Sequence, residues 1–149
     1  MKVRGAQSGI SLIEVMVAVF VLAIGMLGMA GLQMASLRSN QSSYERSAAV
    51  LAAYTMIDRL RADITAARAG SYNLALPANS CTIPSGSTFP ATQLAAWLTD
   101  LQTSMGSSAC GGVTCTTGAT ATCVISVRWD DSRVRGGRTN QTFSIEARL

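Results

Sequence analysis

The chain begins with a short polar stretch, continues into a long apolar run, and mixes apolar with polar positions only after that run. Between Val15 and Leu32 no residue is charged. A stretch of this length is just enough for a membrane span, because ~20 helical residues cross the hydrocarbon core of a bilayer. We therefore predict a transmembrane helix and assign residues 10–37 to it.

The segment 38–69 has the pattern of an amphipathic helix. Apolar residues recur at spacings of three and four and so share one helix face: Val50, Ala53, Ile57, Leu60 and Ile64. No proline interrupts the stretch up to Arg68, and Gly70 suits a C-terminal cap. The sequence thus predicts one long helix, apolar all round in its first half and amphipathic in its second. Arg59 and Asp63 are expected to pair on its polar side.

Residues 70–149 are expected to form a small globular head. The stretch 71–87 is rich in small polar residues and proline, which indicates a loop. A short helix follows, with Pro90 in its first turn and Gly106 at its end. Its apolar stripe consists of Leu94, Trp97, Leu98, Leu101 and Met105. We interpret Trp97 as a core anchor against the long helix or the sheet.

Two stretches near the C-terminus alternate apolar and polar residues with a period of two, the pattern of half-buried strands. The first runs from Cys123 to Trp129 and the second from Thr142 to Leu149. Residues 130–140 between them favour a turn, so we expect an antiparallel hairpin, with residues 112–117 as a candidate preceding strand. The predicted fold class is α+β, with an antiparallel sheet packed on the amphipathic half of the long helix.

The composition fits one small domain on a membrane stalk. A chain of 149 residues is too short for two ordinary domains besides the stalk. It contains no histidine, which removes the usual general base and the commonest metal ligand. It also lacks a phosphate-binding glycine-rich loop, the ligand spacing of an EF-hand, and a C-x-x-C pair. We therefore expect no enzymatic activity, no metal and no cofactor.

All four cysteines lie after residue 80, which indicates disulfides formed in an oxidising compartment. Cys115 and Cys123 lie symmetrically about Ala119. If residues 117–121 form the turn of a hairpin, these two cysteines face each other across its strands, close to the distance that a disulfide needs. Cys81 and Cys110 are then left to pair with each other. Four reduced core cysteines are the alternative.

Arg133, Arg135 and Arg138 cluster between the two predicted C-terminal strands. One interpretation is a solvated turn that Asp130 and Asp131 partly neutralise. The other is a contact patch for a partner protein or a DNA strand. No aromatic residue is interleaved, which argues against stacking on nucleic acid, and we do not expect nucleic acid as a partner. The formal net charge of +4 is also weak evidence for such a partner.

A short motif precedes the apolar run. Lys2 and Arg4 lie in the first nine residues, and Gly9-Ile10-Ser11-Leu12-Ile13-Glu14 follows. The basic residues place the leader in the cytoplasm by the positive-inside rule. Glu14 is a carboxylate at the start of an apolar segment, where burial in a bilayer is costly and indicates function.

This pattern resembles the class III signal of the type IV pilin family, with isoleucine at position 10 where the family usually has phenylalanine. The resemblance implies a leader of residues 1–9 that a prepilin peptidase removes by cutting between Gly9 and Ile10. It also implies methylation of the new amino terminus at Ile10, and a role for Glu14 in assembly of the filament.

The run from Ser11 to Gln33, the segment 54–63 and the stretch Val127-Arg128-Trp129-Asp130-Asp131 are similar to minor pilins of the PilV kind, also called type IV pilus modification proteins. This resemblance implies a low-abundance subunit that primes pilus assembly with other minor pilins and the major pilin, near the tip. The pilus would serve adhesion, twitching motility or DNA uptake, with a tip adhesin as a further partner.

The implied location is the inner membrane, with a single span, a cytoplasmic N-terminus and a periplasmic head, followed by the extracellular pilus. A minor pseudopilin of a type II secretion system carries the same signal and is the first alternative. A membrane-anchored periplasmic binding module is the second, and it differs in predicting no cleavage at Gly9.

Overall fold

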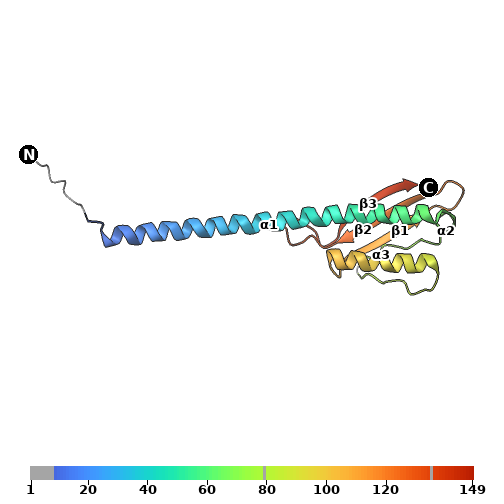
Figure 1. The fold of residues 1–149 in the computed structure, drawn as a ribbon, viewed down its shortest axis with the longest axis horizontal. Helices are drawn as coiled ribbons and strands as arrows, with labels where there is room; N and C mark the ends of the chain where they lie inside the picture. The colour runs from blue at the N-terminus through green and yellow to red at the C-terminus, as the bar shows by residue number, and fades with distance from the viewer. Residues whose placement is uncertain (1–8, 79, 135) are drawn as a thin grey trace, which may run out of the picture. The chain divides into compact units, whose positions relative to one another are not determined.

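The computed structural model describes residues 9–78, 80–134 and 136–149. Three helices come first along the chain: α1 (Leu12–Ala62), α2 (Ile64–Arg68) and α3 (Phe89–Met105). Three strands follow: β1 (Cys110–Cys115), β2 (Thr122–Trp129) and β3 (Gln141–Arg148) (Figure 1). The chain divides into two compact units, Met1–Leu37 and Arg38–Leu149. The architecture is the α+β, type IV pilin-like fold, with a long N-terminal helix and a small antiparallel sheet.

In the first unit, α1 exposes its side chains all round. Its large hydrophobic residues have exposed fractions from 51% at Val15 to 78% at Leu12. By length and composition, α1 is the one helix among the described residues that is apolar enough to cross a membrane. Exposing so much apolar surface to water is energetically unfavourable, so we expect lipid or neighbouring helices to cover it.

The long helix ends earlier than the sequence predicted. It stops at Ala62, Asp63 leaves the helical conformation with φ −126° and ψ 57°, and α2 then adds one short turn. Gly70 ends the helical region as predicted, and its φ is +76°. The amide of Ser71 donates to the carbonyl of Ala66, and the amide of Gly70 donates to that of Ala67, both at 3.0 Å. These are the two hydrogen bonds of a Schellman cap.

The head packs two helices against one face of the sheet. The predicted stripe of α3 is buried in full: Leu94, Trp97, Leu98, Leu101 and Met105. The predicted face of α1 is only partly right. Ala53, Ile57 and Leu60 are buried, whereas Val50 and Ile64 are half-buried and Ala49 and Met56 take part in the core instead. The buried face is therefore rotated toward Ala49 and Met56 relative to the predicted one.

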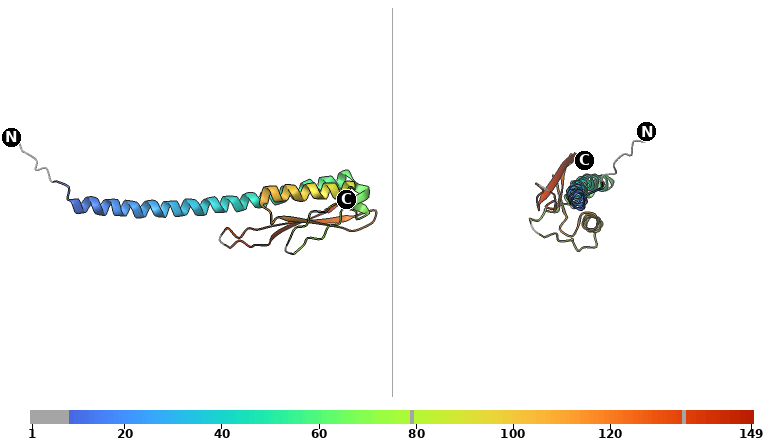
Figure 2. Two further views of the ribbon diagram at one scale, coloured as in Figure 1. Left: turned by 90° about the horizontal axis from the view of Figure 1, so that it is seen from below. Right: turned by 90° about the vertical axis from the view of Figure 1, so that its left-hand side faces the viewer.

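The sheet is an antiparallel meander of order β1-β2-β3. The alternation predicted for β2 is confirmed, with Cys123, Ile125, Val127 and Trp129 buried on one face. The preceding strand begins at Cys110 rather than at residue 112. In the end-on view of Figure 2, both helices lie on the same side of the sheet.

Two adjacent glycines explain how β1 is covered on both faces. A Cβ atom built at Gly111 would lie 2.2 Å from Cη2 of Trp97 on α3. One built at Gly112 would lie 2.8 Å from Cβ of Leu76, in the segment that precedes α3. Only residues without a side chain allow both approaches. The strand is therefore held between α3 on one face and the segment around Leu76 on the other.

Candidate functional site

The N-terminal signal lies at the entry to α1. Gly9 and Ile10 precede the helix and are exposed. Ser11 lies directly before the first helical residue, and its carbonyl accepts hydrogen bonds from the amides of Glu14 at 3.0 Å and Val15 at 3.3 Å. Glu14 is thus an acidic residue in the first turn, where the helix dipole favours negative charge. The Gly9–Ile10 bond therefore lies in non-helical backbone, which a peptidase can reach.

The carboxylate of Glu14 has no hydrogen bond and no ion pair with any residue that the structure describes. Its neighbours along the helix, Ile13 and Val15, are exposed hydrophobic residues. Lys2 and Arg4 lie outside the described residues. Within the described part of one chain, Glu14 is an ionisable group among apolar side chains, and any cation beside it has to come from elsewhere.

Two disulfides stabilise the head, and they join Cys115 to Cys123 and Cys81 to Cys110. Cys115 and Cys123 are direct partners in the register of β1 and β2, which is the geometric condition for the pairing expected from their symmetry. The Cys81–Cys110 bond joins residues 29 positions apart in the sequence, and the loop that it closes contains α3. Such a bond restricts the unfolded chain by about 3–4 kcal/mol on the chain-entropy model.

Arg128 helps to hold the segment before α3 on the outer face of the sheet. The alternating pattern placed this residue on the polar face of β2, yet it is only 5% exposed. Its guanidinium donates hydrogen bonds to the carbonyls of Pro77 and Ala78. Leu74 reinforces the attachment through two backbone hydrogen bonds of 2.8 Å with Val113. In the sequence, the signal for this contact was a single arginine within an otherwise largely apolar strand.

The loop between β2 and β3 is not a simple solvated turn. Asp131 is buried, with 2% exposure, and it accepts a hydrogen bond from Oγ of Ser42 at 3.0 Å. Arg46 lies 3.6 Å from the same carboxylate. Asp131 therefore ties the loop to α1 instead of neutralising the arginines in solvent. Asp130 stays near the surface, and hydrogen bonds from Ser132 lower its pKa.

The ion pair expected between Arg59 and Asp63 is wrong. Arg59 instead donates to the carbonyl of Gln93 at 2.8 Å and lies 3.5 Å from the carboxylate of Asp100, so it links α1 to α3. Asp63 accepts a hydrogen bond of 3.2 Å from the hydroxyl of Tyr72. Burial, followed by the charge of Asp63, raises the pKa of Tyr72 to about 12.

This shift predicts a loss of stability at high pH. The folded pKa of Tyr72 lies above its ordinary value of 10.0, so its stabilising effect is complete below that pH. It is lost as the pH rises toward 12, by about 2–3 kcal/mol in all. We expect urea unfolding of detergent-solubilised protein to show this loss between pH 9 and pH 12, and Tyr72→Phe to lack most of it.

The exposed tyrosine offers a matched control for that measurement. Tyr44 is 66% exposed, so Tyr44→Phe should keep the full decline of the unfolding free energy with pH. An equal decline in Tyr72→Phe and in the unchanged protein would show that Tyr72 does not cause it.

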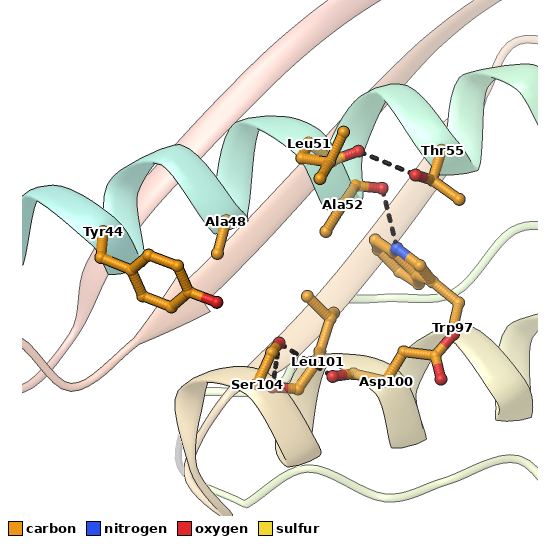
Figure 3. Close-up of a pocket in the computed structure, with 9 residues that line it drawn as sticks. All are labelled: Tyr44, Ala48, Leu51, Ala52, Thr55, Trp97, Asp100, Leu101 and Ser104. Carbon is orange, nitrogen blue, oxygen red and sulfur yellow. Dashed lines mark hydrogen bonds between the residues drawn. The ribbon is translucent and has the colours of Figure 1, made fainter.

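A shallow groove of about 240 Å³ runs between α1 and α3. Its lining consists of Tyr44, Ala48, Leu51, Ala52, Thr55, Trp97, Asp100, Leu101 and Ser104. Figure 3 shows the ring of Tyr44 leaning over one end and the indole of Trp97 closing the other, where its N–H donates to the carbonyl of Ala52 at 3.0 Å. Thr55, Trp97 and Ser104 use their side-chain donors for hydrogen bonds to backbone carbonyls of α1 and α3. The residues that line the groove include no pair of nucleophile and base.

The described residues contain no group of three or more His, Cys, Asp or Glu that could hold a metal ion. Residues 4–30 match the family model of the prokaryotic N-terminal methylation motif. The comparisons with curated proteins and with solved structures found no match. The motif and the fold together support a membrane-anchored, type IV pilin-like protein that is processed by a prepilin peptidase and assembles into a pilus or pseudopilus.

Proposed function

We propose that this protein is a minor pilin of a type IV pilus. The observation that carries the proposal is the motif from Gly9 to Glu14, directly before a helix whose apolar side chains are exposed all round. A helix of this kind is suited first to a bilayer and then to close packing with the helices of other subunits. The disulfide-bonded head fits an oxidising compartment outside the cytoplasm.

In this proposal the leader is cut after Gly9, and the new amino terminus at Ile10 is methylated. Residues 10–37 then form the membrane and filament-core helix, residues 38–69 its amphipathic half, and residues 70–149 the periplasmic head. The subunit lies in the inner membrane with a cytoplasmic N-terminus before it joins the pilus. It acts without a metal or cofactor and has no enzymatic activity.

The proposed partners are other minor pilins and the major pilin, with which the protein primes assembly near the pilus tip. A tip adhesin is a further candidate partner. The similarity of residues 11–33 and 54–63 to PilV-like minor pilins supports this finer assignment. The pilus would then act in adhesion, twitching motility or DNA uptake.

Deletion of the gene tests the proposal against a minor pseudopilin of a type II secretion system. We expect the deletion strain to lose at least about nine-tenths of its sheared surface pili and to secrete type II substrates normally. Expression of the protein from a plasmid should restore the pili. Normal pili together with lost secretion would instead assign the protein to the secretion system.

A further inference from the structure

The loop between β2 and β3 is fixed to the beginning of the head's part of α1. Asp131 receives the hydrogen bond of Ser42 and the contact of Arg46. The loop is also closed on itself, since the amide of Asp131 donates to the carbonyl of Arg138 at 2.9 Å. Its position on α1 is therefore set by a buried carboxylate, close to residue 42 of the helix.

At this end of the head, the arginine side chains are more exposed to solvent than the acidic side chains. Arg38, Arg133 and Arg138 are exposed. The acidic side chains of Glu45 and Asp131 are buried, with exposed fractions of 6% and 2%. The carboxylate of Asp130 accepts a hydrogen bond from the amide of Ser132. Arg46 is 60% exposed and compensates Asp131. The surface that meets solvent here is consequently basic.

Along the chain, few residues separate the membrane span from the part of α1 that holds this loop. Arg38 follows the apolar segment directly, and Ser42 lies about 6 Å further along the helix at 1.5 Å per residue. The part of α1 from Leu12 to Leu37 is about 39 Å long by the same rise. A bilayer with its headgroups is about 40–45 Å thick. Residues 38–42 therefore begin at the level of the outer headgroups when the helix spans a membrane.

We propose that Arg38, Arg133 and Arg138 form a docking surface for the phosphate groups of an anionic lipid bilayer, on which the head rests while the subunit is anchored. A guanidinium binds a phosphate through paired hydrogen bonds and keeps its charge at any physiological pH. The docking requires only the membrane anchor, and it is independent of the subunit's role in a pilus.

Fluorescence quenching in lipid nanodiscs tests this docking. The full-length protein carries Thr139→Cys, an exposed position in the loop, and a fluorophore reacts there because the four native cysteines are in disulfides. The quencher is a spin label on the lipid headgroup. We expect strong quenching with one-third phosphatidylglycerol in phosphatidylcholine, weak quenching with phosphatidylcholine alone, and a decline as salt screens the charges. A label at Ala119→Cys, in the turn between β1 and β2, should show little quenching in either lipid.

Substitution of the loop arginines should remove the lipid dependence. Each arginine near an anionic surface changes such an equilibrium by about fivefold, so Arg133→Ser with Arg138→Ser should lower the ratio of docked to undocked heads by about 25-fold. Lysine at both positions should retain most of the docking. Arg61→Ser with Arg148→Ser removes the same charge from exposed positions far from the loop and should change little.

Equal quenching in neutral and anionic discs would overturn the proposal, as would an equal loss in the control variant. A linear DNA duplex provides a further comparison in a gel-shift assay. If the loop variant loses DNA binding but keeps its contact with lipid, the basic surface serves DNA and the lipid proposal fails. None of these outcomes bears on the proposed role in a pilus, which is measured separately as incorporation of the subunit into pili.

Discussion

Gly9→Leu should abolish processing and leave the protein at its full length in the membrane. A leucine at this position places a bulky side chain at the bond that the prepilin peptidase is proposed to cut. The fold should not suffer, since a Cβ atom at Gly9 meets nothing within 4 Å. Mass spectrometry of membrane-extracted protein should find a chain that begins at Met1 in the variant and at methylated Ile10 in the unchanged protein.

The uncut variant should also be missing from pili, at a level at least about tenfold below the unchanged protein. Retention of Lys2 and Arg4 keeps a charged leader on the end of a helix that would have to leave the membrane and pack among apolar neighbours. Gly31→Ala is the control, because it too places a Cβ atom where nothing lies within 4 Å but is distant from the bond. A Gly9→Leu chain that still begins at Ile10 would exclude cleavage at this bond.

The parts of the fold that follow from local periodicity were predictable. The stripe of α3 and the alternation of β2 each depend on a repeated apolar spacing, and both are buried as expected. The end of the helical region at Gly70 was equally clear, because the positive φ of its cap favours glycine. These signals lie within one element and do not depend on what packs against it.

The features that were missed depend on contacts between distant segments. The buried face of α1 includes Ala49 and Met56 while Val50 is only half-buried, and the spacing of apolar residues alone does not fix which of these side chains meet the core. Arg128 is buried because residues 77 and 78 cross the outer face of the sheet, and those residues have the composition of an ordinary loop. Asp131 is buried because it meets Ser42, 89 positions earlier in the chain.

The candidate site could be predicted from the sequence because it does not depend on contacts between distant segments. Gly9, Ile10 and Glu14 form a linear motif, so their chemistry does not depend on tertiary structure. The structure adds that the bond lies before the helix and that Glu14 occupies its first turn. A single chain cannot supply the partner of Glu14, which makes this residue the most informative one to change.

Glu14→Ala should leave insertion and processing intact but reduce incorporation into pili at least about tenfold. Removing a carboxylate from an apolar helix favours insertion, so the amount in the membrane should not fall. After cleavage, Lys2 and Arg4 are gone and the next cation along the chain is Arg38. The amino group of Ile10 on a neighbouring subunit is therefore the proposed partner of the Glu14 carboxylate. Loss of this pair leaves a charged amine among apolar helices, which is costly.

Two further variants separate charge from shape in this experiment. Glu14→Gln keeps the size of the side chain without its charge and should be nearly as defective as Glu14→Ala. Asp58→Ala removes an exposed carboxylate elsewhere on α1, where its contact with Arg61 is a surface ion pair of little energetic value. It should be incorporated normally. The measurement is the ratio of subunit in sheared pili to subunit in membranes, and normal ratios in both Glu14 variants would show that no such pair guides assembly.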